Sequence, residues 1–231
     1  MTEAHAPEPL LQTDGLVKSY GRTPALRGLS VTIASGEIVA VTGPSGCGKS
    51  TLLHCLAGIV LPDAGEVRYR GRSLNQMSER DRSRLRRTDF GVVFQFGQLV
   101  AELPALDNVA LPLLLGGVRR GAAEAKARQW LDSFGVADVA GDLPGEMSGG
   151  QAQRVALARA MVTSPAVLFA DEPTGALDSL AGEQVLKVLT AQARQQNTTV
   201  VLVTHDATVA AYADREILLR DGALETVGVS S

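Results

Sequence analysis

Four runs of apolar residues stand out along the chain, and each stops at a glycine or a polar residue. They are EIVAVTG at 37–43, FGVVF at 90–94, AVLFAD at 166–171 and TVVLVTH at 199–205. Continuous apolar runs of this length are typical of strands that are buried on both faces of a parallel sheet. Stretches with helical character separate the runs. The pattern therefore predicts an α/β core built on a mostly parallel sheet.

The two ends of the chain have a different pattern. Residues 10–36 contain LLQTDGLVKSYG and ALRGLSVTIASG, which glycines interrupt, and LSVTI alternates apolar and polar residues. This predicts an N-terminal antiparallel β-subdomain. Near the other end, REILLRDG and ALETVGV predict a hairpin that turns at Asp221 and Gly222. Residues 1–9 are polar and proline-rich, and we expect a disordered arm there, ahead of a single domain over 10–231.

The segment 97–163 lacks a strand pattern and contains several prolines. In its stretch EAKARQWLDSFG, four apolar residues recur at helical spacing and share one helix face. These residues are Ala127, Trp130, Leu131 and Phe134. We therefore expect 97–163 to be a helical subdomain that is inserted into the α/β core.

Composition narrows the range of functions. The chain has 231 residues, 45% of them hydrophobic and 20% charged, which suits a globular protein with a sizeable core. Its formal net charge of −3 excludes a global basic field that would draw it to nucleic acid. One local basic run, RDRSRLRR at 80–87, is either a solvated helix face or a patch that binds phosphate or a partner. The sequence leaves both interpretations open.

The cysteines and the apolar runs indicate neither secretion nor membrane insertion. Cys47 lies in a glycine-rich stretch and Cys55 on the helix expected after it, where a disulfide would distort the helix, so we expect a reducing, cytosolic setting. The first residues lack the apolar core of a signal peptide. The longest apolar stretch, VALPLLLGGV near 109–118, is well short of the roughly 20 residues that span a bilayer. We expect no direct membrane span.

A phosphate-binding motif follows the first apolar run. GPSGCGKS at 43–50 matches G-x-x-x-x-G-K-[ST] in full, between a predicted strand and a predicted helix. Glycines let backbone N–H groups turn toward phosphates, and the helix N-terminus adds partial positive charge. We expect Lys49 to reach the β- and γ-phosphates and the Ser50 hydroxyl to bind Mg²⁺. The predicted nucleotide-binding residues here are Gly43, Pro44, Ser45, Gly46, Cys47, Gly48, Lys49, Ser50 and Thr51.

Polar residues come at the ends of the other three apolar runs. Asp171 ends AVLFAD, and Glu172 follows it. Because successive strand side chains point to opposite sides, we expect Asp171 to face Mg²⁺ and Glu172 to act as general base on the attacking water. Two acids at a strand end are often merely solvated, but the phosphate-binding motif favours the catalytic interpretation. Gln95 and His205 occupy similar positions after their strands, where a γ-phosphate sensor belongs; an ordinary polar surface or core residue is the alternative.

A second stretch, EMSGGQAQRVALARA at 146–160, also has the form of a phosphate-binding helix start. Ser148, Gly149 and Gly150 open the predicted helix, whose N-terminus would carry partial positive charge. The chain thus has two phosphate grips but one phosphate-reading lysine. The two motifs taken separately do not explain this.

Taken in order, the motifs resemble those of the nucleotide-binding subunit of ABC transporters, and the resemblance covers nearly the whole chain from Tyr20 onwards. In it, Tyr20 matches the aromatic residue that stacks on adenine, Gln95 the Q-loop glutamine that contacts Mg²⁺, and His205 the switch histidine. Asp171 and Glu172 match the Walker B aspartate and the catalytic glutamate. The matches in the signature motif and the D-loop are Ser148, Gly149, Gly150, Gln151 and Asp178.

The resemblance implies a P-loop NTPase fold and an ATPase that uses ATP and Mg²⁺. In this family two subunits pack head to tail, and the signature helix of one grips the γ-phosphate held by the phosphate-binding loop of the other. Each chain then carries two half-sites, and we expect a homodimer. Met147 stands where leucine is usual, which is a mild change. Gly175 stands where serine is common, and we expect it to loosen communication between subunits.

The other partner implied by the resemblance is an integral membrane permease, which places the chain at the cytoplasmic face of the plasma membrane. The stretch FGQLVAELPALDNVALPLLLGG, after Gln95, resembles ATPases that serve lipoprotein-release, macrolide-export and cell-division permeases. It favours an export or mechanotransmission permease. The ATPase of an importer is the alternative, and a soluble non-transport ATPase is a more distant one. No nucleic-acid partner is expected.

Overall fold

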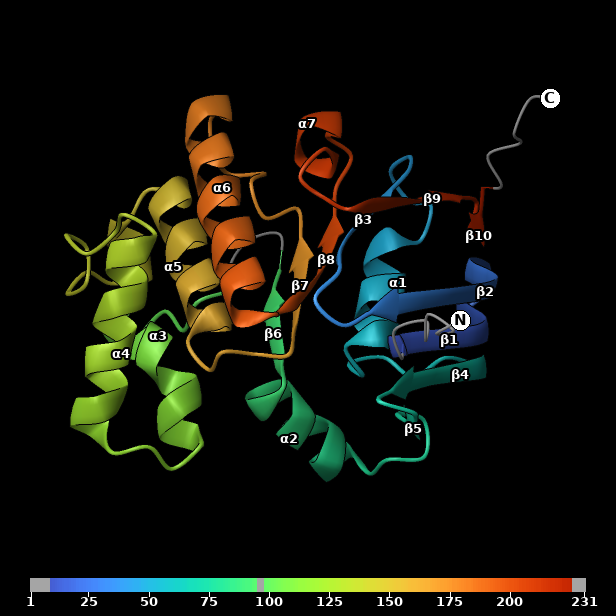
Figure 1. Ribbon diagram of the computed structural model, residues 1–231, viewed down its shortest axis with the longest axis horizontal. Coiled ribbons are helices and arrows are strands. Elements are labelled where there is room, and N and C mark those ends of the chain that lie inside the picture. The colour runs from blue at the N-terminus through green and yellow to red at the C-terminus, as the bar shows by residue number, and fades with distance from the viewer. Residues whose placement is uncertain (1–8, 95–97, 226–231) are drawn as a thin grey trace, which may run out of the picture.

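A computed structural model describes residues 9–94 and 98–225, in which a central sheet has a group of helices on one side and a second sheet on the other (Figure 1). The central sheet has the strand order β10-β9-β3-β8-β7-β6, and its neighbouring strands are parallel except for β9 and β10. The prediction of a mostly parallel sheet is confirmed. The strands are β3 (Ile38–Thr42), β6 (Phe90–Val93), β7 (Val167–Asp171), β8 (Thr199–Val203), β9 (Arg215–Arg220) and β10 (Ala223–Leu224).

The central sheet is buried on both faces, as its continuous apolar strands predict. Every residue of β3, β7 and β8 is buried. Leu168 and Ala170 of β7 belong to one hydrophobic core, whereas Val167 and Phe169 belong to the other. Alternate side chains of one strand therefore supply two cores, one on each face of the sheet.

Helices cover the first of these faces, on the left in Figure 1. The segment predicted as a helical insertion lies here, and its described residues, 98–163, contain helices and no strand. The four apolar residues predicted to share a helix face are all buried in this core. The helices of this side are α3 (Ala105–Leu115), α4 (Arg120–Ser133), a short 3₁₀ helix (Pro144–Glu146), α5 (Gly149–Met161) and α6 (Ser179–Gln196).

The other face packs on helix α1 (Lys49–Leu56) and on a four-stranded antiparallel sheet with the order β2-β1-β4-β5. Pro9 already belongs to β1, so this strand begins within the range predicted as an arm, and the remainder of that range lies outside the described residues. The sequence pattern did not predict β4 and β5. The strands are β1 (Pro9–Tyr20), β2 (Thr23–Ala34), β4 (Ala64–Tyr69) and β5 (Arg72–Ser73).

Two further helices lie next to strands of the central sheet in the sequence. Helix α2 (Glu79–Thr88) precedes β6, and the short α7 (Ala207–Ala210) follows β8. The hairpin predicted around Asp221 is confirmed by the antiparallel pair β9 and β10. Across residues 9–94 and 98–225, no helix combines the length and apolarity that a bilayer span requires.

The register of the central sheet brings several strand ends to one edge. Val41 of β3 and Asp171 of β7 both pair with Val203 of β8. The carboxyl ends of these three strands therefore lie side by side, and the polar residues that follow them share this edge. Ligands of open α/β sheets bind at this kind of edge.

Candidate functional site

The loop after β3 is shaped by close backbone approaches that require glycine. Gly43, Gly46 and Gly48 have φ values of 139°, 78° and 105°, in the region that favours glycine. A Cβ on Gly43 would lie 2.1 Å from the carbonyl oxygen of Leu219, and one on Gly48 would lie 2.3 Å from that of Ala25. Leu219 and Ala25 therefore press against the outside of this loop, which we call the cradle. The backbone at Gly43 and Gly48 lies too close to them for any residue larger than glycine.

Lys49 lies across this cradle. Its Nζ donates hydrogen bonds to the carbonyl oxygens of Gly43, at 2.8 Å, and Pro44, at 2.9 Å, and the side chain is buried among the loop atoms. The ammonium group is thus held against the backbone of the loop. Charge and position fit the phosphate-binding role predicted from the sequence.

Ser50 and Asp171 meet at the start of α1. Burial raises the pKa of the Asp171 carboxyl above its usual range, and a hydrogen bond from Ser50 opposes this shift. Among the described residues no group of three or more acidic, histidine or cysteine side chains could hold a metal ion. One carboxylate and one hydroxyl are a fitting donor set for Mg²⁺, which takes few protein oxygens and completes its shell with water and phosphate.

Glu172 and His205 form a direct pair at the same edge. The His205 Nδ1 lies 2.6 Å from Oε1 of Glu172. The hydrogen bond to Glu172, strengthened by the carboxylate charge, raises the pKa of His205 above its ordinary value. The Thr204 hydroxyl donates to the other Glu172 oxygen at 3.4 Å and accepts from the Asp206 N–H at 3.0 Å. The carboxylate is therefore positioned from two directions.

The backbone reason predicted for the direction of Glu172 is wrong. Strand β7 ends at Asp171, and Glu172 has a φ of 47°, so strand alternation does not orient its side chain. Its N–H still donates to the carbonyl of Val203 at 2.9 Å. A left-handed turn thus aims the carboxylate at His205, and this conformation is costly for a residue with a Cβ.

A groove beside the cradle leads to Tyr20. This groove of about 300 Å³ is lined by residues that include Tyr20, Thr23, Ala25, Lys49 and Thr51. Tyr20 is 52% exposed, and the Lys18 Nζ lies 5.9 Å from the centroid of its ring. An exposed aromatic ring beside this loop has the chemistry to stack on a nucleotide base, and the role of Tyr20 in base stacking stays a prediction.

The second predicted phosphate grip begins α5. Ser148 is the N-cap: its Oγ accepts from the Gln151 N–H at 3.2 Å, and its own N–H donates to Oε1 of Gln151 at 2.9 Å. This reciprocal capping box fixes the helix start. A Cβ on Gly150 would lie 2.9 Å from the Leu177 side chain, so the segment before α6 packs closely on it. Asp178 caps α6 by accepting from the Ala181 N–H.

The structure separates the two grips. Residues of α5 belong to the core on one face of the central sheet, whereas residues of α1 belong to the core on the other face. Both helix starts are free of acidic residues in their first turn. Lys49, Ser50, Asp171, Glu172 and His205 come together at the sheet edge, and the α5 grip stands on the opposite side of the sheet. Gln95 lies outside the described residues.

Sequence reasoning missed three residues that shape the site. Thr204 is buried at 1% exposure and holds Glu172, while Leu219 and Ala25 bring carbonyl oxygens against the cradle. Thr204 stands directly before the candidate His205, and a buried hydroxyl at a strand end was the available signal. The two carbonyl contacts join residues far apart in the chain and leave no local signal.

Comparisons with known proteins show the family to which the chain belongs. A family model described as ABC transporter matches residues 26–175. The lipoprotein-releasing system ATP-binding protein LolD 2 of Caulobacter vibrioides is 44% identical over 222 residues, which is 94% of this chain and 97% of that protein. The macrolide export ATP-binding/permease protein MacB 1 of Aeromonas hydrophila is 45% identical over 94% of this chain, but only 34% of that protein is covered.

A solved structure shares the fold. The dimeric ATP-binding cassette MJ0796, bound to ADP and Pi in a post-hydrolysis state, matches with a TM-score of 0.90 at 36% identity, over 94% of this chain and 97% of that chain. A second dimeric structure of MJ0796 matches with the same TM-score at 37% identity. The similarity extends over both halves of the molecule, including the helical side.

Replacing Gly48 by alanine tests the cradle geometry. We expect Gly48→Ala to abolish ATP binding and to lower the free energy of unfolding, because its Cβ would clash with the Ala25 carbonyl. Gly71→Ala is the matched control, since Gly71 has a φ of 71° and a Cβ added there would meet nothing within 4 Å. The control should cost about 1–2 kcal/mol for strain alone, and Gly48→Ala about 2 kcal/mol more. Equal losses in chemical denaturation would contradict the close approach.

Removing the charge of Glu172 tests the pair with His205. We expect Glu172→Gln to lower the pKa of His205 toward its ordinary value in an NMR titration of the imidazole protons. Glu183→Gln is the control, because Glu183 pairs with Lys187 instead. By linkage, the pair stabilises the fold fully below the ordinary histidine pKa, and this contribution disappears as the pH rises through the raised one. An unchanged His205 titration in Glu172→Gln would show that the pair does not form in solution.

Proposed function

Because the chain belongs to the ABC transporter family, we propose that it is the ATP-hydrolysing subunit of an exporter-type transporter, acting on a permease that is a separate chain. The LolD 2 match covers 97% of a protein named as an ATP-binding component alone, and this supports a separate subunit. The MacB 1 match covers 34% of a protein named as both ATP-binding and permease. The proposal includes a position at the cytoplasmic face of the cell membrane.

The observation that carries the proposed ATPase chemistry is the convergence of Lys49, Asp171 and Glu172 at one sheet edge. Lys49 would hold the β- and γ-phosphates of ATP, and Ser50 with Asp171 would hold Mg²⁺, which would supply positive charge to neutralise the phosphates. Glu172 accepts a proton from the attacking water while the bond from the γ-phosphorus to the bridging oxygen breaks. The products are ADP and phosphate.

His205 and Thr204 serve this step by positioning. With His205 on one oxygen and Thr204 on the other, the Glu172 carboxylate has a fixed direction before water arrives. The imidazole is exposed, with 71% of its side chain accessible, so it can also reach a γ-phosphate that enters the edge. Gln95, which follows β6 in the sequence, would be a further ligand of Mg²⁺ in this proposal.

Two copies complete each other's sites in this proposal. The α5 grip, Ser148 with Gly149 and Gly150, lies across the sheet from Lys49 of its own chain. A second copy, turned head to tail, brings its α5 N-terminus to the γ-phosphate, where backbone N–H groups and the helix dipole stabilise negative charge. The dimeric assemblies of the similar cassette MJ0796 support this arrangement. Gln151 and Asp178 maintain the two helix starts that face the partner.

A groove on the side of the sheet offers the permease a docking site. It measures about 390 Å³, and its lining is mostly apolar, with Ile59, Phe90, Phe94 and Pro112 among the contributors. Phe94 directly precedes the predicted Q-loop residue Gln95 in the sequence, so a partner segment in this groove would contact the chain next to a predicted Mg²⁺ ligand. The relatives' names, lipoprotein-releasing system and macrolide export, favour a permease of the export kind.

The half-site arrangement is testable with two substitutions. We expect Glu172→Gln to form a stable dimer with Mg-ATP in analytical ultracentrifugation, because closure occurs without hydrolysis. Adding Ser148→Arg to this variant should return it to monomer while ATP still binds each chain. The arginine would fill the α5 grip, which in the dimer contacts the phosphate bound by the partner. Ser133→Arg, on an exposed position of α4, is the matched control for added charge and bulk. A Glu172→Gln protein that stays monomeric with Mg-ATP at every concentration would contradict the head-to-tail dimer.

Co-purification tests the permease assignment. A tagged chain extracted from native membranes with mild detergent and ATP should bring with it a permease that has few spans and a large extracytoplasmic domain. ATP hydrolysis should rise when this permease is reconstituted with the chain. A many-span permease accompanied by a solute-binding protein would make the chain an importer subunit instead, and the absence of any membrane protein would refute the transport assignment.

A further inference from the structure

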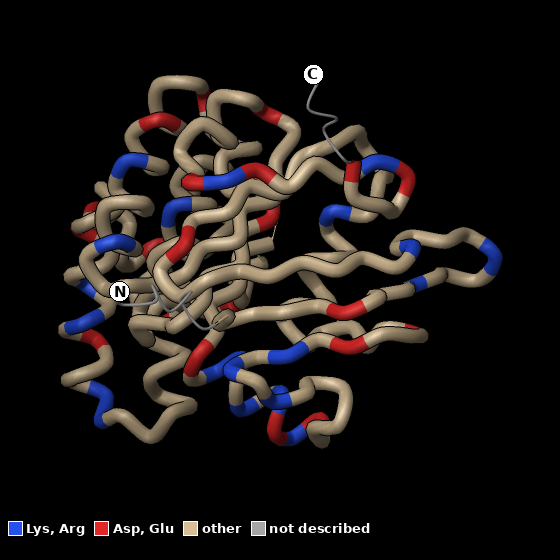
Figure 2. The backbone as a smooth tube through the Cα atoms, turned by 45° about the vertical axis from the view of Figure 1, so that its right-hand side comes forward, with Lys and Arg blue, Asp and Glu red and all other residues tan. Residues whose placement is uncertain are grey.

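Helix α2 carries the basic run singled out in the sequence, and the ATPase chemistry does not use it. Its residues, ERDRSRLRRT, include five arginines and two acids, in a chain whose net charge is −3. Figure 2 shows basic residues gathered at the end of the molecule where this helix lies. The question is which of these arginines belong to the fold and which are available to a partner.

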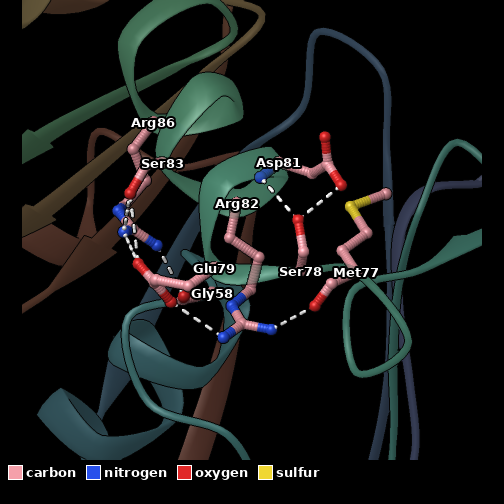
Figure 3. Close-up of polar contacts among 8 residues, drawn as sticks. All are labelled: Gly58, Met77, Ser78, Glu79, Asp81, Arg82, Ser83 and Arg86. Carbon is pink, nitrogen blue, oxygen red and sulfur yellow. Dashed lines mark hydrogen bonds and ion pairs between the residues drawn. The ribbon is translucent and has the colours of Figure 1, made fainter.

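The inner face of α2 carries a network of hydrogen bonds and ion pairs (Figure 3). Glu79 accepts hydrogen bonds from Arg82, at 2.8 Å, and from Arg86. These two arginines lower the pKa of Glu79 to about 2. Arg82 also donates to the carbonyl of Met77, and Arg86 to that of Gly58 after α1. The inner arginines therefore attach the helix to the rest of the protein.

The outer face presents a separate stripe. Arg80, Arg84 and Arg87 follow each other at intervals of four and three residues, so they lie on one side of the helix. All three are exposed, and none forms an ion pair or side-chain hydrogen bond within residues 9–94 and 98–225. The remaining acid of the helix, Asp81, is occupied by the Ser78 hydroxyl. We call Arg80, Arg84 and Arg87 the outer stripe.

The outer stripe meets the apolar groove at Arg87. This residue lines the groove together with Phe90, Phe94 and Pro112. Leu115, one helical turn beyond Pro112 on α3, is 64% exposed and extends the apolar surface past the groove. Arg86 and Arg159 also border the groove, but Arg86 is held by Glu79, and Arg159 donates to the carbonyl of Gln98. Of the three arginines at the rim, Arg87 alone has no ion pair or side-chain hydrogen bond within residues 9–94 and 98–225, and it adjoins an apolar floor.

We infer that the outer stripe selects the permease by its charge. The permease segment that docks in the groove is amphipathic. Its apolar side chains face Phe90, Phe94 and Pro112, and its carboxylates lie along the flank that faces Arg84 and Arg87. This inference rests on the proposed function and specifies the chemistry of the docking partner. Apolar contact at the floor supplies the buried core of such an interface, and charge complementarity at its rim sets partner choice and association rate. An acidic flank gains from the outer arginines, whereas a basic one is repelled.

Charge reversal tests the inference. The double variant Arg84→Glu/Arg87→Glu is mixed with the permease identified by co-purification, held in nanodiscs of zwitterionic lipid so that anionic headgroups are absent. We expect its affinity for the permease to fall about tenfold or more, mainly through slower association, and the salt dependence of binding to become weaker. Arg128→Glu, an exposed position on α4, is the matched control and should bind like the wild type. An unchanged thermal unfolding midpoint shows that each variant is folded.

Rescue identifies the partner group. Replacing the acidic residues of the permease segment by lysine should weaken binding to the wild-type chain and restore binding to the double variant. If the double variant binds the permease as tightly as the wild type does, the stripe is only a solvated face and the inference is wrong. It is equally wrong if the stripe supports binding to permease-free vesicles rich in anionic lipid but not to the permease. A wild-type chain that binds no permease at all would instead refute the proposed function.

Discussion

The site depends on backbone contacts that hold the phosphate-binding loop from two other parts of the chain, the C-terminal hairpin and strand β2. The Gly222 N–H donates to the Cys47 carbonyl at 3.0 Å, and the Arg27 N–H donates to the Gly222 carbonyl at 2.7 Å. The same crossing places the Leu219 carbonyl beside Gly43. The C-terminal hairpin thus lies between the loop and the antiparallel sheet and joins them. A loop with several left-handed residues would be costly by itself, and these neighbours over-determine its shape.

The central sheet explains why acid, hydroxyl and imidazole meet at one edge. Strands β3, β7 and β8 are parallel and in register, so each of the three delivers the residue that follows it to the same edge. Burial on both faces leaves that edge as the place where polar groups can escape the cores. The burial that stabilises the sheet also raises the pKa of Asp171, while Ser50 opposes that shift by a hydrogen bond. The same burial therefore stabilises the central sheet and shifts the pKa of a site residue.

Much of the fold was readable in the sequence because periodicity encodes burial. Continuous apolar runs predicted β3, β6, β7 and β8, and the helical spacing around Trp130 predicted the buried face of α4. Strand β4 was missed because AGEVRY begins with alanine and glycine and owes its pairing to β1, more than forty residues earlier. The left-handed turn at Glu172 has no sequence signature of its own. The groove joins Ile59, Phe90, Pro112 and Thr163, and only the folded chain brings these positions together.

In α2 the inner residues hold the helix to the fold and the outer stripe does not, and this difference has an evolutionary consequence. Glu79 holds Arg82 and Arg86 on the inner face, and these two arginines attach the helix to Met77 and Gly58. The outer positions contribute little to folding, since exposed side chains without partners change stability only slightly when replaced. They can drift from one gene copy to another while the ATPase stays intact. A cell that duplicates such a subunit could thereby separate two transport systems with a few surface changes on one helix.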